Sequence, residues 1–246
     1  LPGAISGHLW VSDSALGFCR LDQVPNSTTT QPNPSTCVKV GGGIAGQASF
    51  DPVLNLVYVA DASVNSQGAY RLSYDPNTET AGNPVLLTAG QMQNTNGTRA
   101  LVFGPDHRLY LGLSNGQIMR ITNLSEASQT VEIVGTTSNG LPAVSFSFVG
   151  NDLYIGETIK VTKAINMGAC FAGFCNPPTA TGINVVAPIA LIYDGSANLF
   201  IANFTTVTSY NPASGVQALY ATAGVAGGVN SLFKNISGLG FDLQGN

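Results

Sequence analysis

A short strand pattern that recurs five times constrains this chain more than any other feature of its sequence. Each copy is a five-residue core with an aromatic residue at its second position. The copies are Leu9–Asp13, Val57–Asp61, Leu109–Leu113, Leu153–Glu157 and Leu199–Asn203. Successive copies begin 48, 52, 44 and 46 residues apart. Helical repeats would show a 3.6-residue period and solenoid repeats are shorter, so this spacing favours four-stranded blades.

The residues on both sides of the core repeat as well. A strand that ends in a polar turn precedes the core, as in Ala48–Pro52 and Leu101–Pro105. A third strand with a basic residue follows the core, as in Gly68–Leu72, and an outer strand comes next, as in Pro84–Leu87. Asn, Asp and Gly at the intervening turns are typical of hairpins. Each repeat therefore predicts four antiparallel strands.

The two ends of the chain complement each other. Gly238–Asp242 has the pattern of a first strand with no core after it, whereas the Leu9–Asp13 core has no first strand before it. We expect Leu239–Asp242 to pair with Leu9–Asp13, because this pairing removes exposed sheet edges. The predicted fold is all-β, a single β-propeller domain over residues 1–246 with five four-stranded blades. Their expected bounds are 238–246 with 1–41, 42–90, 91–137, 138–186 and 187–237.

The core Leu-Tyr-Val-Ala-Asp pattern followed by Gly-x-x-Arg-Leu resembles NHL repeats and the related six-bladed, lactonase-like propellers. Val57–Asp61 with Gly68–Leu72 is the closest match, and Leu9–Leu21 is the next. The resemblance touches all five repeats and implies propeller architecture. Lactonase-like propellers also hold a divalent metal through Glu, Asn and Asp near a central channel. Five copies instead of six indicate either a five-bladed variant or a piece of a longer array.

The composition is typical of a protein outside the cell. Only 9% of the residues are charged, the net charge is −4, and the nine Lys and Arg residues are scattered. We therefore predict no nucleic-acid partner, because no basic stripe is available to neutralise phosphates. The longest apolar runs, such as Val185–Tyr193, are far shorter than the roughly 20 residues of a membrane helix. We predict no membrane span.

The four cysteines form two local pairs in the sequence. We predict the disulfides Cys19–Cys37 and Cys170–Cys175, which indicate an oxidising compartment and a secreted, extracellular or periplasmic protein. A metal site would require closely spaced His partners. The two His residues of the chain lie elsewhere in the sequence, so disulfides are favoured.

The last residues of the repeated cores are the candidate ligand or metal residues. Second strands of propeller blades end on one face, which would gather Asp13, Asp61, Glu157 and Asn203 there. Oxygen ligands of this kind suit Ca²⁺ or another divalent metal. The alternative is structural, with each side chain bonded inside its own blade, as in a pair between Asp61 and Arg71. We predict no cofactor, with the metal as the alternative.

Five Asn-x-Ser/Thr sequons are candidate glycosylation sites in a secreted protein. They are Asn26, Asn96, Asn123, Asn203 and Asn235.

The sequence contains no set of residues typical of a known catalytic mechanism. Both His residues fall in first-to-second-strand turns, and no Gly-x-Ser-x-Gly nucleophile elbow occurs. The leading hypothesis is an extracellular, non-catalytic binding or scaffold propeller that engages a protein, a glycan or a cell-surface component. The alternatives are a metal-dependent, lactonase-like hydrolase that uses the Asp13, Asp61, Glu157 and Asn203 ring, and a structural component of a larger extracellular assembly.

Overall fold

The described chain is built from β-strands. The computed structural model describes residues 9–13, 15–21, 34–42, 45–51, 53–63, 68–75, 77–78, 80–87, 98–126, 129–138, 140–171 and 173–222. These residues contain twenty strands and one short 3₁₀ turn, Met167–Ala169. In this part of the chain, no helix has the length and apolar character that crossing a bilayer requires.

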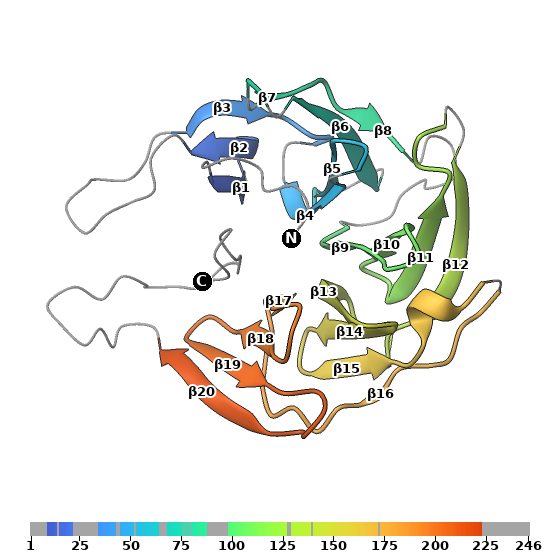
Figure 1. Cartoon of the computed structure of the whole chain (residues 1–246), viewed down its shortest axis with the longest axis vertical. Coiled ribbons are helices and arrows are strands. Elements are labelled where there is room, and N and C mark those ends of the chain that lie inside the picture. The colour runs from blue at the N-terminus through green and yellow to red at the C-terminus, as the bar shows by residue number, and fades with distance from the viewer. Residues whose placement is uncertain are drawn as a thin grey trace, which may run out of the picture. The chain divides into compact units, whose positions relative to one another are not determined.

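The strands form five antiparallel sheets, which follow one another in chain order (Figure 1). The first contains β1 (Leu9–Asp13), β2 (Gly17–Leu21) and β3 (Pro34–Val38). The second contains β4 (Ala45–Asp51), β5 (Leu56–Asp61), β6 (Ala69–Asp75), β7 (Thr80–Ala81) and β8 (Val85–Leu86). The third contains β9 (Ala100–Phe103), β10 (Leu109–Gly112), β11 (Gln117–Thr122) and β12 (Thr130–Thr136). The fourth contains β13 (Ala143–Val149), β14 (Asp152–Glu157), β15 (Val161–Ala164) and β16 (Thr179–Ala180). The fifth contains β17 (Ala190–Tyr193), β18 (Leu199–Ala202), β19 (Thr206–Tyr210) and β20 (Gln217–Thr222).

The blade count differs from the prediction. Four sheets have at least four strands, so the structure shows four complete blades and not five. The N-terminal sheet has three described strands, and Leu239–Asp242, which we expected to add a fourth, lies outside the described residues. The closure of the chain ends and the predicted blade bounds stay predictions. Each repeated core forms the second strand of a four- or five-stranded sheet, or the first strand of the N-terminal one.

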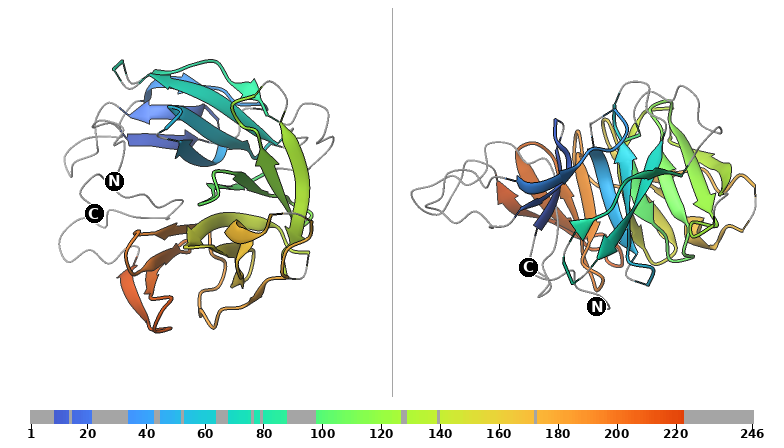
Figure 2. Two further views of the ribbon diagram at one scale, coloured as in Figure 1. Left: turned by 45° about the vertical axis from the view of Figure 1, so that its right-hand side comes forward. Right: turned by 90° about the horizontal axis from the view of Figure 1, so that it is seen from above.

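The described chain divides into two compact units, and the outer part of the third sheet is split between them. In the first unit β4 packs beside β9, and in the second β13 packs beside β17. The same polar link joins the sheets in both units. The Phe103 amide donates to Ser49 Oγ at 3.2 Å, and the Leu191 amide donates to Ser145 Oγ at 3.0 Å. This sheet-after-sheet packing is a propeller arrangement, and Figure 2 shows the strands of each sheet from two further sides.

In four of the repeats the aromatic residue of the core lies directly across from a polar residue of the next strand. Trp10 is paired in register with Arg20, Tyr58 with Arg71, and Tyr154 with Lys163. The Lys163 ammonium lies 5.7 Å from the centre of the Tyr154 ring. The basic residue in the third-strand pattern is therefore the cross-strand partner of the core aromatic, a pairing that stabilises the two strands.

These aromatic rings also form the contacts between sheets. The Tyr58 ring stacks on Phe103 of the next sheet, with ring centres 5.9 Å apart. Burial and, to a smaller extent, the charge of Asp51 raise the pKa of Tyr58 while Arg71 lowers it, and the result is a pKa of about 12. Burial likewise raises the pKa of Tyr154 to about 12, with added contributions from Tyr210 and Asp152. Both phenols are therefore neutral at physiological pH and act as apolar packing groups.

Both predicted disulfides are confirmed. Cys19 and Cys37 lie directly opposite each other on β2 and β3, with their Cα atoms 4.1 Å apart. Cys170 and Cys175 close a short loop between β15 and β16. No cysteine in the described residues is free.

Asp194 organises the tight turn between β17 and β18. Its Oδ1 accepts from the amides of Ser196 at 2.8 Å, Ala197 at 2.8 Å and Asn198 at 3.0 Å. Partial burial raises the pKa of Asp194, but these amides lower it by more, and the result is a pKa of about 2. The folded chain therefore stabilises the ionised form of the Asp194 carboxylate more than the unfolded chain does.

This lowered pKa gives a pH-dependent contribution to stability. The contribution is present above the ordinary pKa of 3.8 and is lost as the pH falls towards about 2. We expect Asp194→Asn to lower the free energy of unfolding above pH 4, and this difference from wild type to shrink between pH 4 and 2. Urea denaturation of both proteins across this range measures it. Asp194→Ala should cost more at neutral pH, because it also removes the acceptor oxygen. A constant difference across the range would contradict this account.

Candidate functional site

Asp61, at the end of β5, is bonded inside its own sheet. The side chain is 2% exposed, and its Oδ1 accepts from the Ser63 amide at 3.0 Å and from the Ser63 hydroxyl. Its Oδ2 accepts from the amide of Gly42, in the loop before β4, at 3.4 Å. The carboxylate therefore ties the end of the second strand to the loop that begins the same repeat.

Glu157, at the end of β14, has the same arrangement in the second unit. Its fully buried carboxylate accepts from the Ser138 amide at 2.9 Å, the Ser138 hydroxyl at 2.8 Å and the Thr162 hydroxyl at 2.7 Å. Ser138 precedes β13 as Gly42 precedes β4, and each lies 19 residues before its acid. The two acids thus form equivalent contacts, which we call strand-end latches.

Asn203, just after β18, forms a third latch with an amide in place of a carboxylate. Its Oδ1 accepts from the backbone amides of Thr205 at 2.9 Å and Thr206 at 2.7 Å. Its Nδ2 donates to the carbonyl of Val186, in the loop before β17, at 3.5 Å. An Asn can do this because the side-chain amide offers both an acceptor and a donor.

The other contacts predicted for this ring either differ from those in the structure or involve side chains outside its described part. Asp13 ends β1, and its side chain lies outside the described part of the structure. The suggested pair between Arg71 and Asp61 is wrong, because Arg71 Nη1 donates to the Leu124 carbonyl at 2.5 Å instead. Among the described residues, no three His, Cys, Asp or Glu side chains gather as a metal ion would require.

Two of the five sequons lie in the described residues. Asn123 is exposed in the turn after β11 with a left-handed φ of 57°, whereas the Asn203 amide is engaged in its latch. Asn26, Asn96 and Asn235 lie outside the described residues. The glycosylation sites stay predictions, and of the two described sequons Asn123 has the more accessible side chain.

A second candidate site is the loop closed by the Cys170–Cys175 disulfide, and its base is firmly anchored. Met167 is fully buried, and the Gly168 amide donates to the Asn151 carbonyl at 2.9 Å. A Cβ on Gly168 would lie 2.7 Å from the Pro105 ring, so only glycine permits this close approach. The Cys175 amide donates to the Val134 carbonyl of β12 at 2.7 Å. The loop therefore starts and ends on fixed points.

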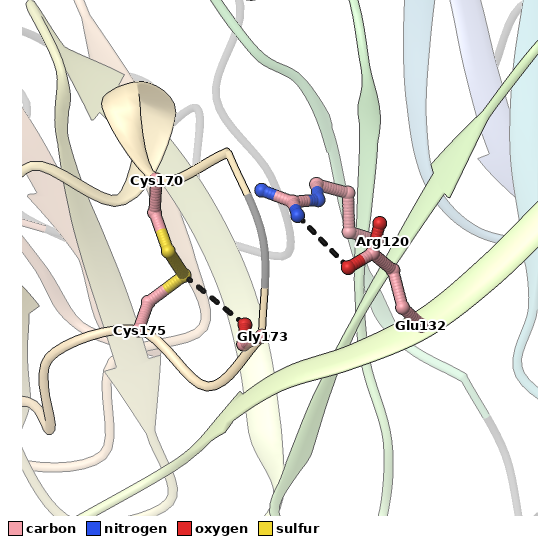
Figure 3. A network of polar contacts seen from close by, with 5 residues as sticks. All are labelled: Arg120, Glu132, Cys170, Gly173 and Cys175. Carbon is pink, nitrogen blue, oxygen red and sulfur yellow. Dashed lines mark hydrogen bonds and ion pairs between the residues drawn. A yellow bond between two sulfur atoms is a disulfide. The ribbon is translucent and has the colours of Figure 1, made fainter.

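The tip of this loop is apolar and exposed. Phe171 is 77% exposed and Phe174 is 62% exposed, whereas Cys175 is buried. Gly173 turns the chain between them with a φ of 71°. Figure 3 shows the disulfide beside Gly173, whose carbonyl lies 3.8 Å from the Cys175 sulfur. The same figure shows the buried Arg120 paired with Glu132 at 2.9 Å.

Exposed pairs of large apolar side chains usually mark interaction sites, because leaving them in water is unfavourable. Here a covalent bond holds two phenyl groups on a loop that is too short to bury them. From the sequence we predicted only the disulfide between Cys170 and Cys175 and no binding role for the loop that it closes. The sequence feature that points to such a role is the position of two Phe residues inside a six-residue disulfide loop.

Comparisons with known proteins identify the fold and no family. Neither a known family nor a curated protein matches the sequence. Among solved structures, an auxiliary nutrient binding protein from Bacteroides thetaiotaomicron is 16% identical, with a TM-score of 0.65 over 99% of this chain and 65% of that one. The extracellular domain of a putative hybrid two-component system from the same species is 16% identical, with a TM-score of 0.50 over 88% and 26%. PorZ, a surface component of the type-IX secretion system of Porphyromonas gingivalis, is 10% identical, with a TM-score of 0.53 over 87% and 32%. This chain thus spans less than two thirds of each neighbour, and the likenesses show a β-propeller-like fold.

The latches predict how the protein responds to divalent metal. Since Asp61 and Glu157 are bonded to protein donors, we expect Ca²⁺ or EDTA to change the melting temperature by no more than about 1 °C. Glu157→Ala should lower the free energy of unfolding by about 1–3 kcal/mol, because three donors lose their acceptor. Scanning calorimetry tests the first point and urea denaturation the second. A rise of many degrees with Ca²⁺ would instead assign these acids to a metal site.

Proposed function

We propose that this chain is an extracellular, non-catalytic binding or scaffold propeller, and that it contacts its target through the Cys170–Cys175 loop. The observation that carries the proposal is the exposure of Phe171 and Phe174 on a loop whose base is buried and bonded. The disulfide fixes the loop before binding, so little conformational freedom is lost on contact. Aromatic side chains of this kind are frequent anchors of binding energy.

The proposed location is outside the cytoplasm, secreted or periplasmic. Two disulfides among the described residues support an oxidising compartment. The neighbours in structure include a nutrient binding protein, the extracellular domain of a putative hybrid two-component system and a surface component of a secretion system. These descriptions agree with a propeller that binds or supports other molecules at a cell surface.

The proposed target is a protein with an apolar pocket. No charged residue occurs between Lys163 and Asp194 in the sequence, so the loop itself carries no charged group for an ionic contact with a glycan acid or a lipid headgroup. Apolar protein pockets bind aromatic side chains chiefly through area removed from water. A metal-dependent hydrolase draws no support from Asp61 and Glu157, because their oxygens accept hydrogen bonds from protein donors.

Site-specific photo-crosslinking tests the proposal. A benzophenone amino acid at position 171 should crosslink one protein from the surface fraction of the source cells. Unlabelled wild type should compete, whereas Phe171→Ala/Phe174→Ala should not, because the double variant lacks the aromatic anchors. The melting temperature of this variant should stay near that of wild type, since both side chains are exposed.

The matched control is Val53, which is 76% exposed in the turn between β4 and β5. The same probe at position 53 should give no specific product, and Val53→Ala should compete like wild type. Equal competition by the double Phe variant would refute the role of the loop. Reduction of the disulfide should weaken competition, because it releases the fixed loop.

A further inference from the structure

Three large apolar side chains are exposed at one end of the fourth and fifth sheets. β13 begins beside the end of β14, and β17 begins beside the end of β18, as their registers show. β13 packs beside β17 within the second compact unit (Figure 1). The Leu191 amide donates to Ser145 Oγ at 3.0 Å, so the starts of these two strands lie next to each other. The segments at this end carry Ile159, Val186 and Phe204.

The loop before β17 joins the turns that follow β14 and β18. Asn203 Nδ2 donates to the carbonyl of Val186 at 3.5 Å, which ties this loop to the turn after β18. A Cβ on Gly156 would lie 3.6 Å from Cγ of Pro188, so the loop also lies against the end of β14. The segments therefore contact one another, and we call the surface that they form the latch end. It consists of residues 157–161, 184–189 and 203–206.

The apolar side chains of the latch end project from closed turns. Val186 is 67% exposed, and Ile159 and Phe204 are 55% exposed. A backbone hydrogen bond closes each of the two turns, at 2.8 Å after β14 and at 3.0 Å after β18. The backbone is thus fixed while the side chains stay in water. A group of exposed apolar side chains of this kind marks an interaction site.

The accessible charge at the latch end is positive. Of its residues only Glu157 and Lys160 are charged. Glu157 is fully buried, and its oxygens accept from protein donors. Lys160 is half-buried, and among the described residues no acid forms an ion pair with it. The net charge of −4 arises in the first 157 residues, because the rest of the chain contains three Lys and two Asp. A negatively charged partner can therefore approach this end.

We propose that the latch end contacts the surface of an anionic lipid layer, with Ile159, Val186 and Phe204 in the interfacial region and Lys160 at a headgroup phosphate. A lipid layer takes up apolar side chains from separate segments at once and is attracted by basic residues. The Lys160 side chain can place its methylene groups among the apolar side chains and its ammonium among the headgroups.

The polar residues between the apolar side chains favour lipid over a protein pocket. Thr158, Asn184 and Thr205 are exposed at the latch end. A dry protein pocket would have to supply a hydrogen-bond partner for each polar group that it buried. A headgroup layer contains water and phosphate oxygens, so these groups keep their hydrogen bonds while the apolar side chains leave the water.

The latch end and the Cys170–Cys175 loop lie at opposite ends of the strands of the fourth sheet. The loop is anchored where β14 begins, because the Gly168 amide donates to the Asn151 carbonyl, whereas the latch end lies where β14 ends. Lipid contact does not rest on the binding function proposed for the loop. If both hold, the protein can face a lipid surface with one end and a target protein with the other. Three apolar side chains and one cation should give weak, reversible binding.

Co-sedimentation of the whole chain with lipid vesicles tests the proposal. The probes are vesicles of phosphatidylcholine alone and vesicles in which about one third of the lipid is phosphatidylglycerol, an anionic lipid. Wild type should bind the anionic vesicles more strongly. Ile159→Ser/Phe204→Ser should lower the partition constant at least about tenfold, because two apolar side chains no longer leave the water. Lys160→Glu should lower binding to the anionic vesicles about tenfold or more.

The matched control is Val53→Ser/Leu54→Ser, which changes two exposed apolar side chains in the turn between β4 and β5. This variant should bind both kinds of vesicle like wild type. The melting temperature of Ile159→Ser/Phe204→Ser should stay near that of wild type, since both side chains are exposed. A loss of binding then reports on the surface and not on folding.

A fluorescent label identifies the end that meets the lipid. An environment-sensitive dye on Phe204→Cys should shift its emission to the blue with anionic vesicles, because the dye enters an apolar region, and the same dye on Val53→Cys should not. Wild type that binds neither vesicle, equal binding by Ile159→Ser/Phe204→Ser, or an equal shift at position 53 would each overturn the proposal. Absence of vesicle binding together with photo-crosslinking of position 204 to a protein would instead assign the latch end to a protein partner.

Discussion

The burial of the core aromatic side chain in the second, third and fourth repeats is the constraint on which the rest of this structure depends. Tyr58 and Tyr110 are fully buried and Tyr154 is 2% exposed, each at the centre of a second strand. A side chain of this size removes 150–250 Å² from water, so its position fixes which face of the sheet meets the next one. The sheet cannot slip by one residue without exposing it. Repeating this residue therefore repeats the register of every sheet.

Register explains which parts of the fold were predictable. The strands, their order and the cross-strand position of Arg71 and Lys163 follow from alternation around the aromatic core, which is a local property. The outer strands were placed less well. The expected strand at 84–87 is the two-residue β8 (Val85–Leu86), and a second two-residue strand, β7 (Thr80–Ala81), precedes it. Outer strands bury little, so burial constrains their sequences weakly. The blade count required a contact between chain ends, which no local pattern determines.

In the candidate site, too, the residues could be recognised from the local sequence, whereas their contacts depend on residues distant in sequence. Asp61, Glu157 and Asn203 were recognisable because they end repeated cores, yet their role depends on partners in earlier loops without a repeated sequence. Asp61 and Glu157 accept from donors 19 residues earlier, and Asn203 donates to a carbonyl 17 residues earlier. An acid at a strand end has the same residue type whether it binds an ion or a backbone amide. Asp61, Glu157 and Asn203 all accept hydrogen bonds at this position, whereas in the third repeat the buried Leu113 occupies it.

The distribution of charge along the chain determines which kinds of group its surface exposes. Between residues 164 and 233 the only charged side chain is Asp194, and its carboxylate is held by a turn. A surface made by such a segment cannot use ionic contacts, so it must expose either backbone, amide and hydroxyl groups or apolar side chains. Here it exposes the phenyl groups of Phe171 and Phe174 and the β20 edge. The disulfide closes the loop that carries the two phenyl groups, and Leu219 and Tyr220 of β20 are 65% and 69% exposed. Both features have a physical cost in an isolated chain, and both costs are offset when apolar contacts cover them.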